Sequence, residues 1–259
     1  MKLFDLNIGV MLNNKDKVAK LILQDNYDVV VLQESMRKLN GNVKSMFNSC
    51  NALQEKTAYK NSFFGPLWYG TKEVENGKIT ADFGGCVEQG NQTLTNFPIV
   101  KASNVFYYLK YGMYEDATNF KKDDHPRAFT NTILDANGKE LQIINVHGLW
   151  SKNKTGSLRT AKQLTAILKQ IRFDIPSIVV GDFNLLPSTS QIKSLGKKLR
   201  NLIAENGIKS TRPSFDDGLD TGNIVCDYIF VNRLVKVNKF EVIQTNISDH
   251  YPLILDFDI

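Results

Sequence analysis

The sequence has few cysteines, and the three that it has form no pattern. Cys50, Cys86 and Cys226 are odd in number, lie far apart and match no metal-binding or redox spacing. Free thiols are typical of a reducing compartment. The N-terminus carries Lys2 and Asp5 where a signal peptide has its apolar segment, and no apolar run approaches the length of a membrane span. We therefore expect a cytoplasmic protein without a transmembrane segment.

The sequence also lacks a strong charge of one sign. A net charge of +5 favours an anionic substrate only weakly, and the dense basic patches of a dedicated nucleic-acid binder are missing. With 259 residues, 42% of them hydrophobic, the chain can bury a large core. No repeat, low-complexity tract or linker divides it, so a single domain over 1–259 is expected. The sequence gives no indication of the oligomeric state.

Strand-like apolar runs outnumber helical ones, and the two kinds are intercalated along the chain. Helical spacing predicts a helix after the capping residues 13–16, a helix over 157–171 and a basic helix over 193–200, and the mixed segment 36–59 is also predicted to be helical. Strands are predicted at 3–10, 28–33, 140–147, 178–180, 225–231, 239–243 and 252–257. This pattern predicts a layered α/β or α+β fold.

Tight turns and one long loop are predicted between these elements. Asn76-Gly77 and Asn137-Gly138 each lie between strand-like runs, which is typical of a β-hairpin. The polar segment 113–127, in which lysines and aspartates nearly cancel, is predicted to be a surface loop.

The most informative segment is SIVVGDFN at 177–184. Its β-branched apolar run predicts a buried strand, yet it ends in Asp182 and Asn184. Turn chemistry explains one polar residue after a buried strand better than two. Carboxylate and amide oxygens placed together can orient a water molecule or hold a hard cation.

Other predicted strands also begin or end in polar residues. Each residue alone has an ordinary explanation as a turn, a cap or a hydrogen-bonded core group. Their repeated occurrence at strand ends favours a shared functional site instead. They are Asn7, Glu34, His147, Asp227 and the pair Asp249-His250.

In their order and wording, these motifs resemble the exonuclease–endonuclease–phosphatase superfamily, which has the DNase I-like fold, and in particular a small single-domain member of the bacterial type. The matching pieces span nearly the whole chain: Asn7, LQE at 32–34, a degraded glycine-to-proline strand at 90–99, NVH at 145–147, GDFN at 181–184, CDYI at 226–229 and SDHYPL at 248–253. The resemblance implies a four-layer α-β-β-α sandwich of two mostly antiparallel sheets.

The resemblance also implies hydrolysis of a phosphate ester, usually a phosphodiester, with Mg²⁺ or Mn²⁺. A hard divalent cation prefers oxygen ligands. In the family pattern Glu34 is the best ligand, with Asn7 and Asp249 as neighbours. The metal would neutralise the charge that develops on the phosphoryl oxygens and the leaving group.

The groups that would act on water follow from the same resemblance. Asp182 and His250 are the two candidates for deprotonating the attacking water, and the sequence does not choose between them. Asn184 would hold the water or a phosphate oxygen. Asp227 would hydrogen-bond His250, which would fix the tautomer of the imidazole and raise its pKa.

Substrate contacts are expected on the other side of the phosphate. His147 would contact the phosphate there, with Asn145 in support. Arg127 and Arg159 are candidates for binding substrate phosphate, although a solvated surface position would explain either arginine.

The chain departs from the family pattern beside His147. In the DNase I branch, the residue that matches His147 is paired with a glutamate near the glycine-to-proline strand. Either Glu88 or Gly90 falls at that place here. A general-acid role for His147 therefore stays open.

The class of phosphate ester is the main open question. The leading hypothesis is a phosphodiesterase of endonuclease type acting on DNA or RNA, and the alternative is a phosphatase or phosphodiesterase acting on a small phosphorylated metabolite or phospholipid headgroup. A lipid-directed enzyme could use the apolar segment 63–69, which more often packs in a core. A third hypothesis is a catalytically silent binding module, which has no need of the intact acids and histidines.

Overall fold

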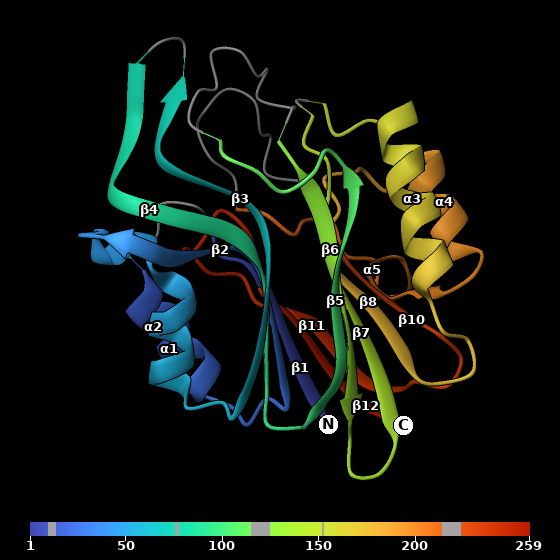
Figure 1. Cartoon of the computed structure of the whole chain (residues 1–259). Helices are drawn as coiled ribbons and strands as arrows, with labels where there is room; N and C mark the ends of the chain where they lie inside the picture. Colours follow the sequence, from blue (N-terminus) through green and yellow to red (C-terminus); the bar gives the residue numbers. More distant parts are fainter. Residues whose placement is uncertain (10–13, 76–77, 115–124, 152, 214–223) are drawn as a thin grey trace.

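The protein is a sandwich of two β-sheets, each covered by helices on its outer side (Figure 1). The computed structural model describes residues 1–9, 14–75, 78–114, 125–151, 153–213 and 224–259. Helices α1 (Lys15–Leu23) and α2 (Ser49–Thr57) cover the first sheet, and α3 (Leu158–Gln170) and α4 (Ser190–Gly196) cover the second. The predicted α+β class and four-layer arrangement are confirmed.

Each sheet contains six strands within the described residues. The first has the order β11-β12-β1-β2-β4-β3 and consists of β1 (Lys2–Asn7), β2 (Val29–Gly41), β3 (Asn61–Glu75), β4 (Lys78–Thr95), β11 (Lys236–Val242) and β12 (Leu253–Asp258). The second has the order β5-β6-β7-β8-β10-β9 and consists of β5 (Ile99–Tyr108), β6 (Arg127–Asp135), β7 (Glu140–His147), β8 (Ser177–Asp182), β9 (Arg200–Asn201) and β10 (Asp227–Val231). Two short helical segments, η1 (Ser45–Phe47) and α5 (Leu202–Glu205), complete the described elements.

A single parallel pair lies at the centre of each sheet, and all other described pairs are antiparallel. The two parallel pairs are β1 with β2 and β7 with β8. Parallel strands bring their carboxyl ends to the same edge of a sheet, and ligands of open α/β sheets bind beyond that edge. Asn7 is opposite Gln33 in the first pair, and His147 is opposite Asp182 in the second.

The side-chain pattern of β1 explains why polar groups collect at this edge. Phe4 and Leu6 pack in the cluster with α1, whereas Leu3 packs in the cluster formed with the second sheet. Because side chains alternate along a strand, Asp5 and Asn7 share the face of Leu3. The face toward the second sheet therefore changes from apolar to polar along β1, and it ends in Asn7.

The predicted helix over 36–59 is wrong in its first part. Strand β2 continues through Met36 to Gly41 because the long strand β4 pairs with it as far as Gly85. Only η1 and α2 are helical in this segment. The apolar segment 63–69 lies in β3, and its residues Leu67 and Trp68 are buried in a core cluster. This burial leaves them no free surface for a lipid.

Most other local predictions are confirmed. Ser157 caps α3 through a reciprocal pair of hydrogen bonds with Thr160. Asn137 and Gly138 both have positive φ angles and turn β6 into β7, as a tight hairpin requires. The basic helix ends at Gly196, before Arg200. The predicted turn at 76–77 and most of the predicted loop at 113–127 lie outside the described residues.

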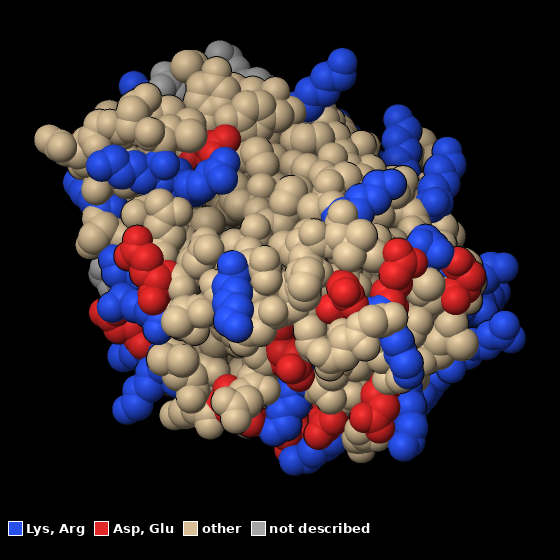
Figure 2. Space-filling model, turned by 60° about the horizontal axis from the view of Figure 1, so that its bottom comes forward, with Lys and Arg blue, Asp and Glu red and all other residues tan. Residues whose placement is uncertain are grey.

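Basic and acidic side chains are interspersed on the face that Figure 2 shows. Many of the exposed charges are paired, as in the contacts of Lys2 with Asp25 and of Lys239 with Glu241. That face therefore offers no continuous basic surface for a nucleic acid. In the part of the chain that the structure describes, no helix has both the length and the apolar character needed to cross a bilayer.

Candidate active site

Residues from both sheets meet at the carboxyl ends of the parallel strands. The side-chain amide of Asn7, the last residue of β1, donates to Glu34 Oε1 at 3.1 Å and to Asp182 Oδ2 at 3.2 Å. Glu34 belongs to the first sheet and Asp182 ends β8 of the second. Asn7 thus joins two of the predicted site residues across the sandwich.

The backbone turns Glu34 out of its strand. The pairing of β2 with β4 shifts register between Leu32 and Ser35, and Glu34 has a φ of 58°. A β-bulge of this kind redirects a side chain, and a positive φ is uncommon for a residue other than glycine. Asn184 has the same feature, with a φ of 53°. Such backbone strain is typical of functional sites.

Asp182 is almost fully buried and receives several N–H groups. The backbone N–H of Asn184 donates to Oδ1 at 2.8 Å, and its side-chain amide donates to Oδ2 at 3.0 Å, next to the contact from Asn7. The preceding residue has to be glycine, because Gly181 has a φ of 126° and a Cβ there would lie 2.3 Å from the carbonyl oxygen of Val146. The carboxylate is therefore held firmly in one orientation.

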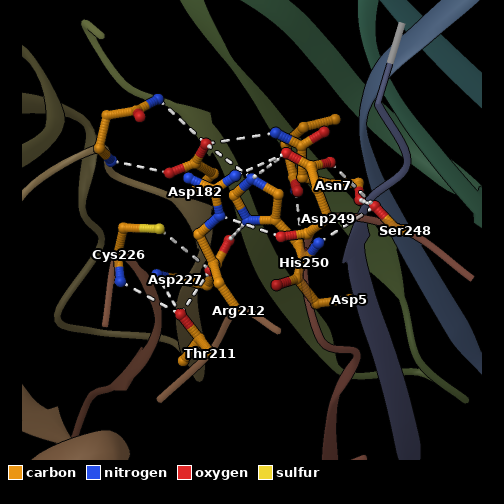
Figure 3. A network of polar contacts seen from close by, with 12 residues as sticks. Asp5, Asn7, Asp182, Thr211, Arg212, Cys226, Asp227, Ser248, Asp249 and His250 are labelled. Carbon is orange, nitrogen blue, oxygen red and sulfur yellow. Dashed lines mark hydrogen bonds and ion pairs between the residues drawn. The ribbon is translucent and has the colours of Figure 1, made fainter. Parts of the chain in front are cut away.

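His250 and Asp227 form a buried pair (Figure 3). The distance from His250 Nδ1 to Asp227 Oδ1 is 2.8 Å, and Thr211 donates its hydroxyl to Asp227 Oδ2 at 2.6 Å. Burial by itself lowers the pKa of His250, but the charge and hydrogen bond of Asp227 outweigh burial and raise this pKa well above its ordinary value. The other ring nitrogen, Nε2, lies 3.9 Å from Asp182 Oδ2. Asp249 Oδ2 lies 3.7 Å from the same nitrogen, so the protonated imidazole faces both the Asp182 and the Asp249 carboxylates.

His147 has the opposite electrostatic environment. Burial and the adjacent guanidinium of Arg127 lower the pKa of His147 well below its ordinary value. Arg127 Nη1 lies 3.3 Å from Nδ1 and 3.4 Å from Nε2 of the imidazole. His147 Nε2 is 3.5 Å from Glu34 Oε1. His147 is thus a neutral imidazole between an arginine and a carboxylate.

The glutamate expected beside His147 has other partners. Glu88 accepts hydrogen bonds from Arg37 at 2.6 Å and from the hydroxyl of Tyr111 at 2.7 Å. Gly90 pairs with Ser35 in the sheet. Neither contact involves His147, whose ring lies beside Arg127 and Glu34 instead.

Asp249 lies at the more open side of the site. Its side chain is 43% exposed and forms an ion pair with Arg212 at 2.8 Å. Ser248 holds the segment against β1 by donating its hydroxyl to the carbonyl of Asn7 at 2.6 Å. The negative charge of Asp249 and, above all, burial raise the pKa of Glu34 to about 7. Glu34 nevertheless keeps 21% of its side chain exposed, so it remains accessible from solvent.

Two carboxylates at this edge have the chemistry that a hard divalent cation prefers. Glu34 and Asp249 offer partly exposed carboxylate oxygens, which suit Mg²⁺ or Mn²⁺. Asn7 fits less well as a ligand. Its side-chain oxygen Oδ1 already accepts a hydrogen bond from the backbone N–H of Gly9, and its side-chain amino group points to the carboxylates.

A second possible metal-binding group among the described residues is fully buried. Its ligand atoms lie within 4.8 Å of one another and belong to Asp182, Cys226, Asp227 and His250.

One of the predicted substrate contacts, Asn145, is a buried residue between the sheets. Asn145 has no exposed surface, and its amide bridges the sheets by accepting from Gln33 and donating to the carbonyls of Leu32 and Gln92. This placement suits a structural role and leaves no atom free for a substrate. The guanidinium of Arg159, on α3, lies 4.8 Å from the ring centroid of Tyr108.

Three residues near the site were missed by the sequence interpretation. Thr211 anchors Asp227, Arg212 pairs with Asp249, and Lys154 donates to Asn184 Oδ1 at 2.7 Å. All three lie in polar segments without periodic apolar residues. No sequence signal distinguished them from ordinary loop residues.

Comparisons with known proteins agree with this architecture. The model of the Endonuclease/Exonuclease/phosphatase family matches residues 6–250. No curated protein matched the sequence. Similar solved structures include an endonuclease/exonuclease/phosphatase from Beutenbergia cavernae, with a TM-score of 0.74 and 18% identity over 99% of this chain and 71% of that chain.

Two further structures match over the full length of both chains. An endonuclease/exonuclease/phosphatase family protein from Leptotrichia buccalis has a TM-score of 0.71 and 18% identity, with 100% of each chain covered. A mannosyl-6-phosphatase from Bacteroides thetaiotaomicron has a TM-score of 0.67 and 13% identity, again with 100% of each chain covered. At such low identities these likenesses show the fold alone.

Proposed function

The chain belongs to the endonuclease/exonuclease/phosphatase family, and we propose that it hydrolyses phosphodiesters of DNA or RNA with the help of Mg²⁺ or Mn²⁺. The observation that carries this proposal is the convergence of Asp182, the His250–Asp227 pair and Glu34 at one edge of the sandwich. The site draws on both sheets, so we propose that 1–259 works as one domain. The three free cysteines support a cytoplasmic location.

Asp182 is the proposed general base. The raised pKa of His250 keeps its imidazole protonated at neutral pH, so His250 cannot accept the proton of the attacking water there. Asp182 is a carboxylate held by Asn7 and Asn184 with a fixed orientation. In this assignment Asp182 takes the proton from water, and the Asn184 amide, which already contacts Lys154, Gly148 and Asp182, keeps the Asp182 carboxylate in place.

His250 is the proposed charge stabiliser. Its Nε2–H lies on the side of Asp182, where it can donate to an oxygen of the phosphate as negative charge develops. Asp227 keeps the imidazole oriented and charged through Nδ1. His147 is neutral, so we assign it a hydrogen bond to the phosphate and no general-acid role at neutral pH.

Glu34 and Asp249 are the proposed metal ligands. A bound Mg²⁺ would supply Lewis-acid stabilisation of the phosphoryl oxygens. The chain's own part is to bring two carboxylates to the accessible side of the site, with Asn7 holding Glu34 and Arg212 holding Asp249.

Metal affinity is expected to depend on pH through Glu34. Because its pKa is about 7 without metal, a proton competes with the cation below that pH. Affinity for Mg²⁺ should therefore fall by about tenfold per pH unit below pH 7 and level off above it. Calorimetric titration of the metal-free protein with Mg²⁺ across this range measures the effect. Glu34→Gln should bind weakly at every pH, whereas equal wild-type affinities on both sides of pH 7 would contradict the assignment of Glu34.

A substrate panel tests the proposed activity. Wild-type protein with Mg²⁺ would be offered supercoiled DNA, RNA, bis-p-nitrophenyl phosphate, p-nitrophenyl phosphate, sugar phosphates, inositol phosphates and sphingomyelin. Cleavage of DNA or RNA supports the proposal. Turnover of monoesters alone would overturn the nucleic-acid substrate and favour the second candidate, a phosphatase, which the fold shared with a mannosyl-6-phosphatase supports. Turnover of none would indicate a binding module.

A further inference from the structure

Lys154 lies in the loop between β7 and α3, and its position is unusual for a lysine. The residue is only 5% exposed, and its φ of 48° is in the left-handed region. Its backbone is fixed at both ends, since its N–H donates to Ser151 O at 3.0 Å and its carbonyl accepts from Leu186 N at 2.9 Å. The ammonium group donates to Asn184 Oδ1 at 2.7 Å. The fold therefore places this cation beside a proposed catalytic residue.

The charge of Lys154 is not balanced within the described part of the chain. No carboxylate of a described residue forms an ion pair with it. An ammonium group has three N–H donors, and among the described residues only Asn184 accepts from one. Lysine is almost never fully buried unless it is paired, because desolvation of an unpaired charge is costly. This arrangement suits a site that receives an anion.

Asn184 connects Lys154 to the reacting groups. The ammonium group of Lys154 can only donate hydrogen bonds, so it must face the side-chain oxygen of Asn184 and not its amino group. This contact fixes the orientation of the Asn184 amide. The amino group of Asn184 then faces Asp182 Oδ2 at 3.0 Å. Lys154 and Asp182 thus contact opposite ends of the same amide, and an anion that binds against Asn184 would meet an ammonium group whose other two donors have no acceptor among the described residues.

We propose that Lys154 is a substrate-binding residue whose ammonium group contacts a non-bridging oxygen of the phosphate. The proposal rests on the proposed function for the identity of the substrate, but it concerns the phosphate group common to every candidate ester. Charge-assisted hydrogen bonds to phosphate are among the stronger ones in proteins. The bound phosphate would supply the negative charge that the described residues do not provide.

The test compares Lys154→Met with wild type. Methionine is also long and unbranched, so the variant places no new steric demand on the backbone at this position and removes the charge. Lys193→Met, which removes an exposed lysine of α4, is the matched control. The unfolding temperature of each protein is measured in Mg²⁺ buffer with inorganic phosphate or with chloride at equal ionic strength. Binding of phosphate to the folded state raises this temperature.

Wild type and Lys193→Met should both be stabilised by phosphate. Lys154→Met removes a buried charge that has no counterion among the described residues, but it also leaves Asn184 Oδ1 without its donor. Because these two effects oppose each other, its unfolding temperature without phosphate should stay close to that of wild type. Its apparent dissociation constant for phosphate should be at least about tenfold weaker. A phosphate affinity of Lys154→Met equal to that of wild type would exclude the contact and overturn the proposal.

The same experiment separates this proposal from the proposed activity. If no ester is hydrolysed but the phosphate shift depends on Lys154, the activity fails and the phosphate contact stands. If an ester is hydrolysed, Lys154→Met should lower kcat/KM by at least about tenfold. Lys154→Arg keeps the charge and should recover part of both phosphate affinity and kcat/KM. An arginine variant as weak as the methionine variant would show that the charge is not what matters.

Discussion

Asp182→Asn is expected to lower kcat by about 10³-fold, within the range typical for loss of a general base. The amide is almost the same size as the carboxylate, but it cannot take a proton from water. It also brings an NH2 group toward the N–H donors of Asn7 and Asn184, which bind the carboxylate in the wild-type protein. Steady-state hydrolysis by the purified variant on any ester that wild type cleaves measures the effect.

The fold of Asp182→Asn should survive the substitution. Leaving the amino groups of Asn7 and Asn184 without their acceptor costs about 1–3 kcal/mol of stability. The free energy of unfolding of a typical domain is about 5–15 kcal/mol. Circular dichroism and the unfolding temperature should show a folded, somewhat less stable protein. Wild-type rates in this variant would show that Asp182 is not the general base, and His250 would then be the remaining candidate.

His250→Gln is expected to lower kcat by about 10²–10³-fold, as removal of a donor to developing charge does in other sites. Glutamine can still donate a hydrogen bond to Asp227, but it carries no charge. Because the pKa of His250 is raised well above its ordinary value, the imidazolium form is present at neutral pH and is lost as the pH rises through this pKa. The wild-type rate should therefore fall on the alkaline side.

The pH–rate profile separates a charge stabiliser from a general base at this position. The rate of His250→Gln should be low at every pH, and it should not fall further at alkaline pH, because this variant has no imidazolium to lose. A general base at His250 would instead produce a wild-type rate that rises as the imidazole loses its proton. That profile would contradict the assigned roles of both His250 and Asp182.

Among the residues proposed for the site, the sequence could indicate those that interrupt or end an apolar strand. Glu34, His147 and Asp182 stand out because a period-two or continuous apolar pattern stops at them, and parallel pairing then brings their strand ends together. The long extension of β2 past Met36 was not predictable, since its pairing with β4 is a long-range contact that local propensity does not encode.

Loop residues could not be found in this way. Lys154 and Thr211 come near the site only because their loops fold against residues that follow or begin other strands, Asn184 and Asp227. The same limit explains Asn145, which the motif placed near substrate and the structure buries as a bridge between the sheets. A motif identifies which residues share a site, but the three-dimensional contacts decide what each can touch.

The most direct test of the central claim is the metal dependence of hydrolysis. Wild-type protein would be stripped of divalent ions with EDTA, assayed on the best ester from the panel, and assayed again after addition of Mg²⁺ or Mn²⁺, with Asp182→Asn as the contamination control. We expect no hydrolysis in the stripped protein, recovery with either cation, and no recovery in Asp182→Asn. Full activity of the wild type in EDTA, or equal recovery in Asp182→Asn, would contradict metal-dependent hydrolysis at this site.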